Sequence, residues 1–137
     1  SAKTFDEKVH DLRSRMEVSR VLHEMRKPTL AVIPGAAACA GLSLALACDL
    51  RIAVDNAKLT TAFSRIGLSG EFGGSYFMTY LVRAAMAREL YFTGKVLGGS
   101  EAHEIGLVNR VVTVDALPGA AEDHASDPSA LATIGLL

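Results

Sequence analysis

The run PGAAACAGLSLALACDLRIAV, residues 34–54, carries the strongest structural signal in the chain. Residues 35–41 within it have almost no side-chain bulk, so their backbone amides can come close to a ligand or to a packed neighbour. The leucine-rich residues 42–48 that follow predict a short helix. We therefore expect a loop of bare amides that leads into a helix N-terminus.

Extended segments flank this run on both sides. Residues 29–33 are apolar and lie between two prolines, which is typical of a buried strand. Residues 49–54 alternate polar and apolar side chains, Asp55 and Asn56 favour a turn, and residues 58–60 resume an extended pattern. We interpret these last segments as a short hairpin.

Helices are predicted before and after these strands. Residues 5–26 place apolar side chains on one stripe of a helix, and Thr4 with Glu7 forms a capping box at its start. Beyond the hairpin, the pattern predicts a glycine-rich loop over residues 61–74, a helix through residues 76–81, another over residues 84–91 and a strand over residues 107–112.

The length of 137 residues fits one domain, with a core over residues 1–114 and a C-terminal helical tail over residues 115–137. A hydrophobic content of 50% and a charged content of 21% indicate a folded chain. A net charge of −1 leaves no basic excess, so we expect no nucleic-acid and no membrane partner. The two cysteines and a charged start without an apolar leader predict a reducing, cytoplasmic setting.

Metal and nucleophile sites find little support in the sequence. The four histidines are scattered and form no paired ligand motif, so we predict no metal site. Cys39 has no identifiable base nearby, and we interpret it as a small buried residue. The glycine-rich residues 70–75 match neither of the common nucleotide-binding motifs.

Two loops together indicate chemistry that neither indicates alone. Ala40 and Gly41 would offer backbone amides at a helix N-terminus, where an oxyanion is stabilised. Glu71 stands between Gly70 and Phe72, and a carboxylate beside an aromatic ring in a confined loop can move protons. This combination suits enolate chemistry. The alternative is that Glu71 is an ordinary surface residue and that the alanines only let a helix pack closely.

A known family shows the same pattern. IPGAAACAGLSLALACDLRIAVDNAKLTTAFSRIGLSGEFGGSYFMTYLV, residues 33–82, resembles the central segment of the crotonase, or enoyl-CoA hydratase/isomerase, superfamily. MARELYFTGKVLGGSEAHEIGLVNRVV, residues 86–112, resembles the segment that follows it. The resemblance implies a crotonase-like (ClpP/crotonase) α/β fold, a spiral of β-β-α turns that binds acyl-CoA thioesters.

The resemblance also assigns the amide-bearing loop. Ala40 falls where the family places one backbone amide of its oxyanion hole, and Gly41 opens the helix beside it. Cys39 stands where glycine is common in the family. The other oxyanion amide belongs to N-terminal strands that would precede residue 5.

Proton transfer is assigned in the same way. Ser43 and Phe63 occupy the positions at which typical hydratases carry catalytic glutamates, and neither can transfer a proton as a carboxylate does. Glu71 matches a position where family isomerases acting on dienoyl-CoA carry an acidic residue, and Phe72 would restrict water beside it. The resemblance therefore implies isomerisation by one carboxylate more readily than hydration by two.

Family members are roughly twice this length, so we expect an incomplete spiral with an abbreviated C-terminal region. The implied substrate is an acyl-CoA thioester of lipid or fatty-acid metabolism, with no cofactor. The implied assembly is a homotrimer or a dimer of trimers. The alternative reading is a catalytically silent protein that binds acyl-CoA or only forms oligomers.

Overall fold

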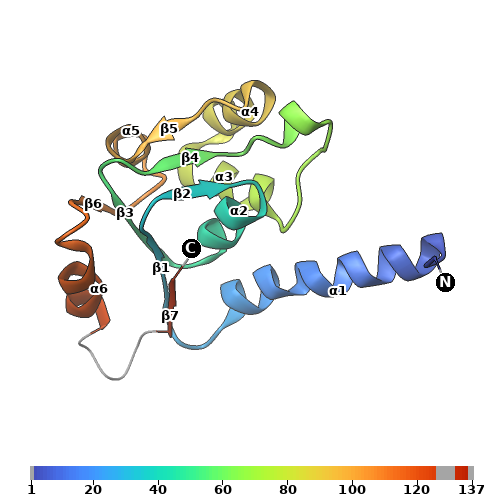
Figure 1. The fold of residues 1–137 in the computed structure, drawn as a ribbon, viewed down its shortest axis with the longest axis horizontal. Coiled ribbons are helices and arrows are strands. Elements are labelled where there is room, and N and C mark those ends of the chain that lie inside the picture. The colour runs from blue at the N-terminus through green and yellow to red at the C-terminus, as the bar shows by residue number, and fades with distance from the viewer. Residues whose placement is uncertain (1, 126–131, 136–137) are drawn as a thin grey trace.

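The computed structural model describes residues 2–125 and 132–135 (Figure 1). Its strands form two sheets. In chain order the strands are β1 (Thr29–Ile33), β2 (Ala36–Ala38), β3 (Leu50–Val54), β4 (Lys58–Thr60), β5 (Leu97–Gly98), β6 (Arg110–Val112) and β7 (Ala132–Gly135). One sheet has the order β6-β3-β1-β7 and the other has the order β2-β4-β5.

Helices connect and flank these strands. They are α1 (Phe5–Glu24), α2 (Ala40–Ala47), the 3-10 turn η1 (Phe63–Ile66), α3 (Gly74–Val82), α4 (Ala84–Thr93), α5 (Gly99–Glu104) and α6 (Leu117–Ala125). Among the described residues, no helix is both long enough and apolar enough to cross a bilayer.

A β-β-α unit occurs twice in succession. β1, β2 and α2 form the first unit, and β3, β4 and α3 form the second. In each unit the first strand joins the four-stranded sheet and the second strand joins the three-stranded sheet. Equivalent strands pair in parallel, with Leu30 opposite Leu50 in one sheet and Ala37 opposite Leu59 in the other. The chain therefore advances by one strand in each sheet at every turn, which is the geometry of a spiral.

The predicted hairpin is wrong, although its turn is present. The amide of Ala57 donates to the carbonyl of Val54 at 3.1 Å, but β3 pairs with β1 and β6 while β4 pairs with β2 and β5. The alternating pattern in β3 misleads because Arg51, a polar position, is buried and only 3% exposed. A strand buried on both faces belongs in the middle of a parallel sheet.

Several other expected boundaries are confirmed with small shifts. The capping box of Thr4 and Glu7 starts α1, which ends at Glu24 and not at residue 26. Helix α2 begins two residues earlier than expected. Residues 36–38, expected to be loop, form β2 because their small side chains allow parallel pairing with β4.

The C-terminal region differs from a purely helical tail. It contains α6, but β7 pairs in parallel with β1 and adds a strand to the four-stranded sheet. The rest of the expected helical tail, residues 126–131 and 136–137, lies outside the described residues, and residues 132–135 form a strand.

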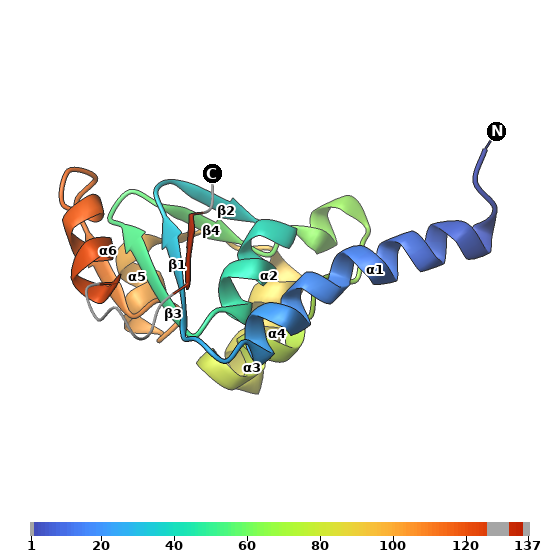
Figure 2. The same ribbon diagram turned by 90° about the horizontal axis from the view of Figure 1, so that it is seen from below.

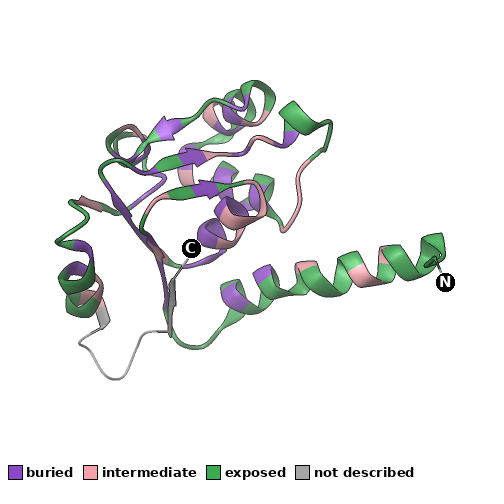
Figure 3. Cartoon of the chain, in the orientation of Figure 1, coloured by how far each residue is buried: buried purple, intermediate pink, exposed green. Residues whose placement is uncertain are grey.

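The core lies between the sheets and helices α2 and α3. Its largest fully buried side chains include Leu30, Ile33, Ile52, Leu59 and Met78. Burying an aliphatic side chain of this size contributes about 1.5–3 kcal/mol. Helix α1 extends away from this body, and its C-terminal turns lie beside α2 (Figure 2). Most of α1 is exposed, and Ser19 and Leu22 are its buried residues (Figure 3).

Candidate active site

The first turn of α2 presents unpaired backbone amides, as the sequence predicts. Cys39 is the N-cap residue, and the first intrahelical hydrogen bond runs from the Ser43 amide to the Cys39 carbonyl at 3.0 Å. The amides of Ala40, Gly41 and Leu42 therefore have no partner within the helix. A β-carbon on Gly41 would meet no atom within 4 Å, so open space lies beside this turn.

Cys39 has an unusual backbone conformation. Its φ of 50° and ψ of −119° lie in a region that favours glycine, and its side chain makes no capping hydrogen bond. The Cys39 amide donates to the Thr60 carbonyl at 3.1 Å, which ties the turn to the end of β4. This contact maintains a conformation that an L residue rarely adopts.

The loop that carries Glu71 bends sharply. Gly70, Phe72 and Gly73 have φ values of 110°, 56° and 70°, and the Gly74 amide closes the turn by donating to the Glu71 carbonyl at 3.2 Å. Glu71 is half-buried. Phe72 is one of the residues that line a cavity of about 310 Å³ between α1 and α3.

The two loops meet where α3 begins. A β-carbon on Gly74 would lie 2.2 Å from the Ser43 Oγ and 2.5 Å from the Tyr91 hydroxyl. Only a residue without a side chain fits at this contact. The end of the Glu71 loop, at Gly74, therefore packs against Ser43 in the first turn of α2.

Positions 43 and 63, where the resemblance leads us to expect catalytic glutamates, carry buried residues without a carboxylate. Ser43 is 1% exposed, and its hydroxyl donates to the Cys39 carbonyl at 3.2 Å. Phe63 is 2% exposed, and its ring stacks on that of Tyr91 with centroids 6.3 Å apart and planes 2° from parallel. Neither residue supplies a carboxylate.

Tyr91 is a residue of this region that the sequence analysis missed. It lies on α4, far along the chain, and burial raises the pKa of its hydroxyl, while the neighbouring Ser43 hydroxyl acts in the opposite direction. In the sequence it lies in an apolar helical stretch, where a tyrosine is typically a core residue. The signal that could have found it is the glycine at position 74, which leaves room for its hydroxyl.

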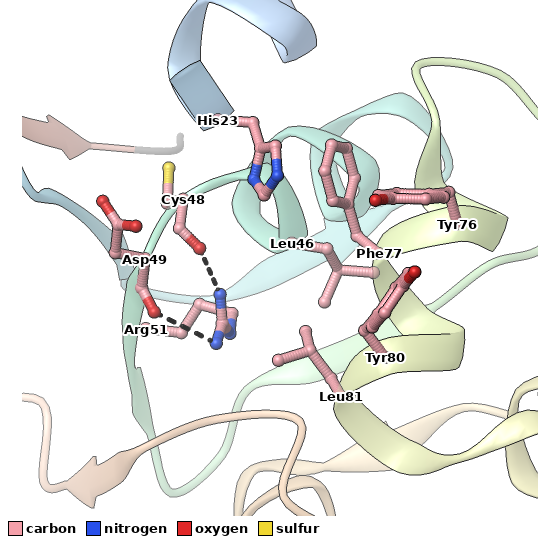
Figure 4. Close-up of a pocket in the computed structure, with 9 residues that line it drawn as sticks. All are labelled: His23, Leu46, Cys48, Asp49, Arg51, Tyr76, Phe77, Tyr80 and Leu81. Atoms are coloured by element: carbon pink, nitrogen blue, oxygen red, sulfur yellow. Dashed lines mark hydrogen bonds between the residues drawn. The ribbon is translucent and has the colours of Figure 1, made fainter. Parts of the chain in front are cut away.

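A separate cavity of about 360 Å³ lies at the other end of α2 (Figure 4). None of the predicted site residues lines it. His23 from α1 and Tyr76, Phe77 and Tyr80 from α3 form an aromatic wall, with the His23 and Phe77 ring centroids 5.0 Å apart. Arg51 lies on the opposite side of the cavity (Figure 4).

The polar groups of this cavity are engaged with the backbone. The Arg51 guanidinium donates to the carbonyls of Leu107 at 2.7 Å and Cys48 at 2.6 Å, and burial lowers its pKa. Asp49 accepts from the amide and the hydroxyl of Thr29 at 2.7 and 2.9 Å. Burial also raises the pKa of the Cys48 thiol. These hydrogen bonds stabilise the fold. The N-terminal end of α2, with its free amides, is therefore the better candidate for an active site.

In the part of the chain that the structure describes, no three His, Cys, Asp or Glu side chains gather closely enough to hold a metal ion.

The alternation of strands between two sheets, with bare amides at the start of α2, defines a crotonase-type α/β spiral. The family model for enoyl-CoA hydratase/isomerase matches residues 4–127, and the chain belongs to that family. A crotonyl-CoA hydratase from Syntrophomonas wolfei is 40% identical over 101 residues, which cover 74% of this chain and 39% of that protein.

Solved structures agree with this assignment. An enoyl-CoA hydratase from Bacillus anthracis matches with a TM-score of 0.86 at 29% identity, covering 93% of this chain and 50% of that chain. A Thermobifida fusca protein of the enoyl-CoA hydratase type, solved in complex with acetoacetyl-CoA, matches with a TM-score of 0.84 at 29% identity, covering 88% and 48%. The chain thus spans about half the length of these structures, as expected for an incomplete spiral.

Proposed function

We propose that this chain is the amide-bearing part of an enzyme that acts on acyl-CoA thioesters through an oxyanion-stabilised enolate. The observation that carries the proposal is the contact of Gly74 with Ser43, which joins the Glu71 loop to the free amides at Ala40 and Gly41. The complex of the Thermobifida fusca relative with acetoacetyl-CoA supports a substrate of this class. We place that substrate in lipid or fatty-acid metabolism.

The proposed reaction moves a double bond without adding water. Glu71 takes a proton from the carbon next to the thioester carbonyl, the electron pair of that C–H bond shifts toward the thioester oxygen, and the Ala40 amide stabilises the resulting enolate. The carboxylic acid then returns the proton to the far carbon of the original carbon–carbon double bond, so that this double bond moves next to the carbonyl. With serine at position 43 and phenylalanine at position 63, this site lacks the two carboxylates that activate water in hydratases. No metal or cofactor takes part in this scheme.

Phe72 has a supporting role in this proposal. Phe72 follows Glu71 directly, has a φ of 56° and lines the cavity between α1 and α3. We expect it to restrict water and to contact the acyl chain of the substrate.

The second candidate is a silent member that binds acyl-CoA without turning it over. The strained Cys39 and the absence of carboxylates at positions 43 and 63 favour it. Turnover of a panel of enoyl-CoA thioesters, measured beside their affinities, separates the two functions. Affinity without turnover supports the silent protein.

Glu71→Gln tests the proton transfer in the full-length protein that contains this chain. The amide keeps the shape but removes the base, so we expect kcat to fall about a hundredfold or more with acyl-CoA affinity nearly unchanged. Glu104→Gln, at an exposed position on α5, is the matched control and should retain full activity. Unaltered turnover in Glu71→Gln removes this residue from the mechanism.

We also propose a homotrimer or a dimer of trimers in the cytoplasm. Exposed apolar side chains along α1 and at its C-cap support association with further protein surface; they are Phe5, Leu12, Val18 and Val21 on the helix and Met25 at the C-cap. Two free thiols, Cys39 and Cys48, suit a reducing compartment. Light scattering of the full-length protein measures the assembly, and a monomer at micromolar concentration would contradict it.

A further inference from the structure

We propose that Ser19 determines substrate specificity by selecting acyl groups that carry a hydroxyl or carbonyl oxygen beyond the thioester. This inference rests on the proposed function, because it concerns the acyl part of the same substrate. Ser19 lies on the wall of the cavity of about 310 Å³ between α1 and α3, which Phe72 also lines. Its side chain is otherwise enclosed, and the residue is 4% exposed.

The Ser19 hydroxyl has no hydrogen-bond partner among residues 2–125 and 132–135. A serine or threonine within a helix often donates to the carbonyl four residues earlier. The hydroxyls of Ser43, Thr79 and Thr93 do so in α2, α3 and α4, at 3.2, 2.8 and 2.7 Å. Ser19 departs from that pattern, and a buried hydroxyl without a partner is unfavourable. A ligand oxygen that pairs with Ser19 would remove this cost.

Ser19 can offer its hydroxyl to a molecule in the cavity. The oxygen of a serine takes one of three staggered positions about the Cα–Cβ bond, and a change of position leaves the helix in place. A hydroxyl both donates and accepts, so it pairs with a carbonyl oxygen or with another hydroxyl. Because Ser19 lies on the cavity wall, we expect such a group on a bound ligand to reach it.

The other residues of the wall suit a neutral, apolar group. Met16 contributes from α1, and Phe72 and Phe77 contribute from the opposite side. Arg20 and Glu24 are on the same wall and form an ion pair with each other, so Arg20 is not free to bind an anion. Small-molecule sites usually measure about 300–1,000 Å³, so this cavity fits a short chain or a single ring.

The neighbouring loop connects the cavity with the proposed reaction centre. Phe72 and Gly73 line the cavity, and Glu71 directly precedes them. The next residue, Gly74, packs against Ser43 in the first turn of α2. Four consecutive residues therefore contain the proposed proton carrier, two positions on the cavity wall and the contact with the amide turn. A thioester held at that turn would have its acyl group beside this loop.

The test measures binding of matched acyl-CoA thioesters to the full-length protein by titration calorimetry. One set is hexanoyl-CoA with its 5-oxo and 6-hydroxy derivatives, and the other is phenylacetyl-CoA with its 3-hydroxy and 4-hydroxy derivatives. None of their acyl chains contains the double bond that the proposed reaction moves, so affinity is measured without turnover. The two sets distinguish an aliphatic from an aromatic source of the oxygen.

We expect at least one oxygenated thioester to bind about tenfold more tightly than its parent, the usual scale for one hydrogen bond. Ser19→Ala should remove this preference and leave the affinity of the parent thioester nearly unchanged. Its melting temperature should not fall, because the change breaks no hydrogen bond among the described residues and alanine favours a helix. Ser14→Ala, at an exposed position on the same helix, is the matched control and should keep the preference.

A second variant tests the location of the acyl group. Met16→Trp adds volume to the cavity wall, so we expect it to weaken the binding of every thioester in both sets. If a folded Met16→Trp protein binds all of them as the wild type does, the acyl group does not occupy this cavity and the inference is wrong.

Three further results decide between the proposals. The role of Ser19 is wrong if the wild type shows no preference for an oxygenated thioester, or if Ser19→Ala keeps it, and turnover of enoyl-CoA then still supports the proposed function. A lower melting temperature of Ser19→Ala would show that the hydroxyl has a structural partner, which also overturns its role. A wild-type protein that binds none of these thioesters and turns over no enoyl-CoA refutes both proposals.

Discussion

The two ends of α2 are built in opposite ways. At the N-terminal end, the amides of Ala40, Gly41 and Leu42 have no partner within the helix, and no side chain caps the turn. At the C-terminal end, the Arg51 guanidinium donates hydrogen bonds to the carbonyl of Cys48 and, at 3.4 Å, to that of Ala45. The same eight-residue helix therefore leaves its positive end free for a ligand and saturates its negative end for stability.

One end of α2 is therefore built for stability and the other is available for function. A buried arginine bound to carbonyl oxygens replaces the water that these oxygens would otherwise need. Free amides in open space cost little until a ligand approaches, because water can satisfy them. Substitutions at the C-terminal end should therefore affect folding, and those at the N-terminal end should affect activity.

The largest expected effect is the loss of Arg51. Arg51→Met keeps an apolar stem of similar length but leaves the carbonyls of Cys48 and Leu107 without their donors. We expect the free energy of unfolding to fall by about 3 kcal/mol or more. Urea denaturation measures it, with the exposed Arg88→Met on α4 as the control that should change it little. A loss below about 1 kcal/mol would mean that the C-terminal end is not saturated by this side chain.

The next effect concerns the polar contact that joins the starts of β1 and β3. Thr29 is fully buried, and its hydroxyl donates to Asp49 at 2.9 Å and accepts from the Asp49 amide at 2.9 Å. Thr29→Val keeps the volume and removes both bonds, so we expect a loss of about 2 kcal/mol of unfolding free energy. Thr113→Val, at an exposed loop position, should cost close to nothing. Equal costs for the two variants would contradict the role of this contact.

A smaller effect, of opposite sign, is expected at the N-terminal end. Cys39→Gly removes the side chain from a residue with a φ of 50°, and we expect it to stabilise the protein by about 1 kcal/mol. The matched substitution at the other end, Cys48→Ala, shrinks a buried side chain and should destabilise it by about 1 kcal/mol. Calorimetry compares the two melting temperatures. If Cys39→Gly melts below the wild type, the strain at this turn is absent.

The sequence predicts the structure best where the contacts that determine it are local. The Thr4 and Glu7 capping box lies within one helical turn, and the change from small residues to leucines places the start of α2 within two residues. The hairpin prediction failed because β3 pairs with β1 and β6, which are not its neighbours in the sequence. The alternation of polar and apolar residues in this segment could not reveal that Arg51 is buried and donates to backbone carbonyls.

The candidate site shows the same division. The residues at 40, 41 and 71 can be found from loop composition and family resemblance, because each depends on its immediate neighbours. Tyr91 could not be found, since its importance comes from contacts with Ser43, Phe63 and the glycine at 74, which tertiary packing alone brings together. The neighbours of Tyr91 are therefore visible only in three dimensions.

The smallest expected effect is the pH dependence of Cys48, at the saturated end of α2. Burial raises the pKa of its thiol above the ordinary value of 9.0, and the nearby Arg51 acts in the opposite direction. A raised value means that the folded protein holds the proton more tightly than the unfolded chain does. The contribution of Cys48 to stability is therefore complete below pH 9 and declines as the pH rises beyond it.

We expect the cost of Cys48→Ala, measured by urea denaturation between pH 7 and about pH 10, to become smaller above pH 9. Leu46→Ala, at a neighbouring buried position without a titratable group, provides the control, and its cost should stay constant over the same range. If the Cys48→Ala cost stays equally constant, the thiol exchanges no protons with folding. A cost that grows with pH would show that Arg51 stabilises the thiolate more strongly than burial opposes it, and the C-terminal end of α2 would then be an electrostatic site in its own right.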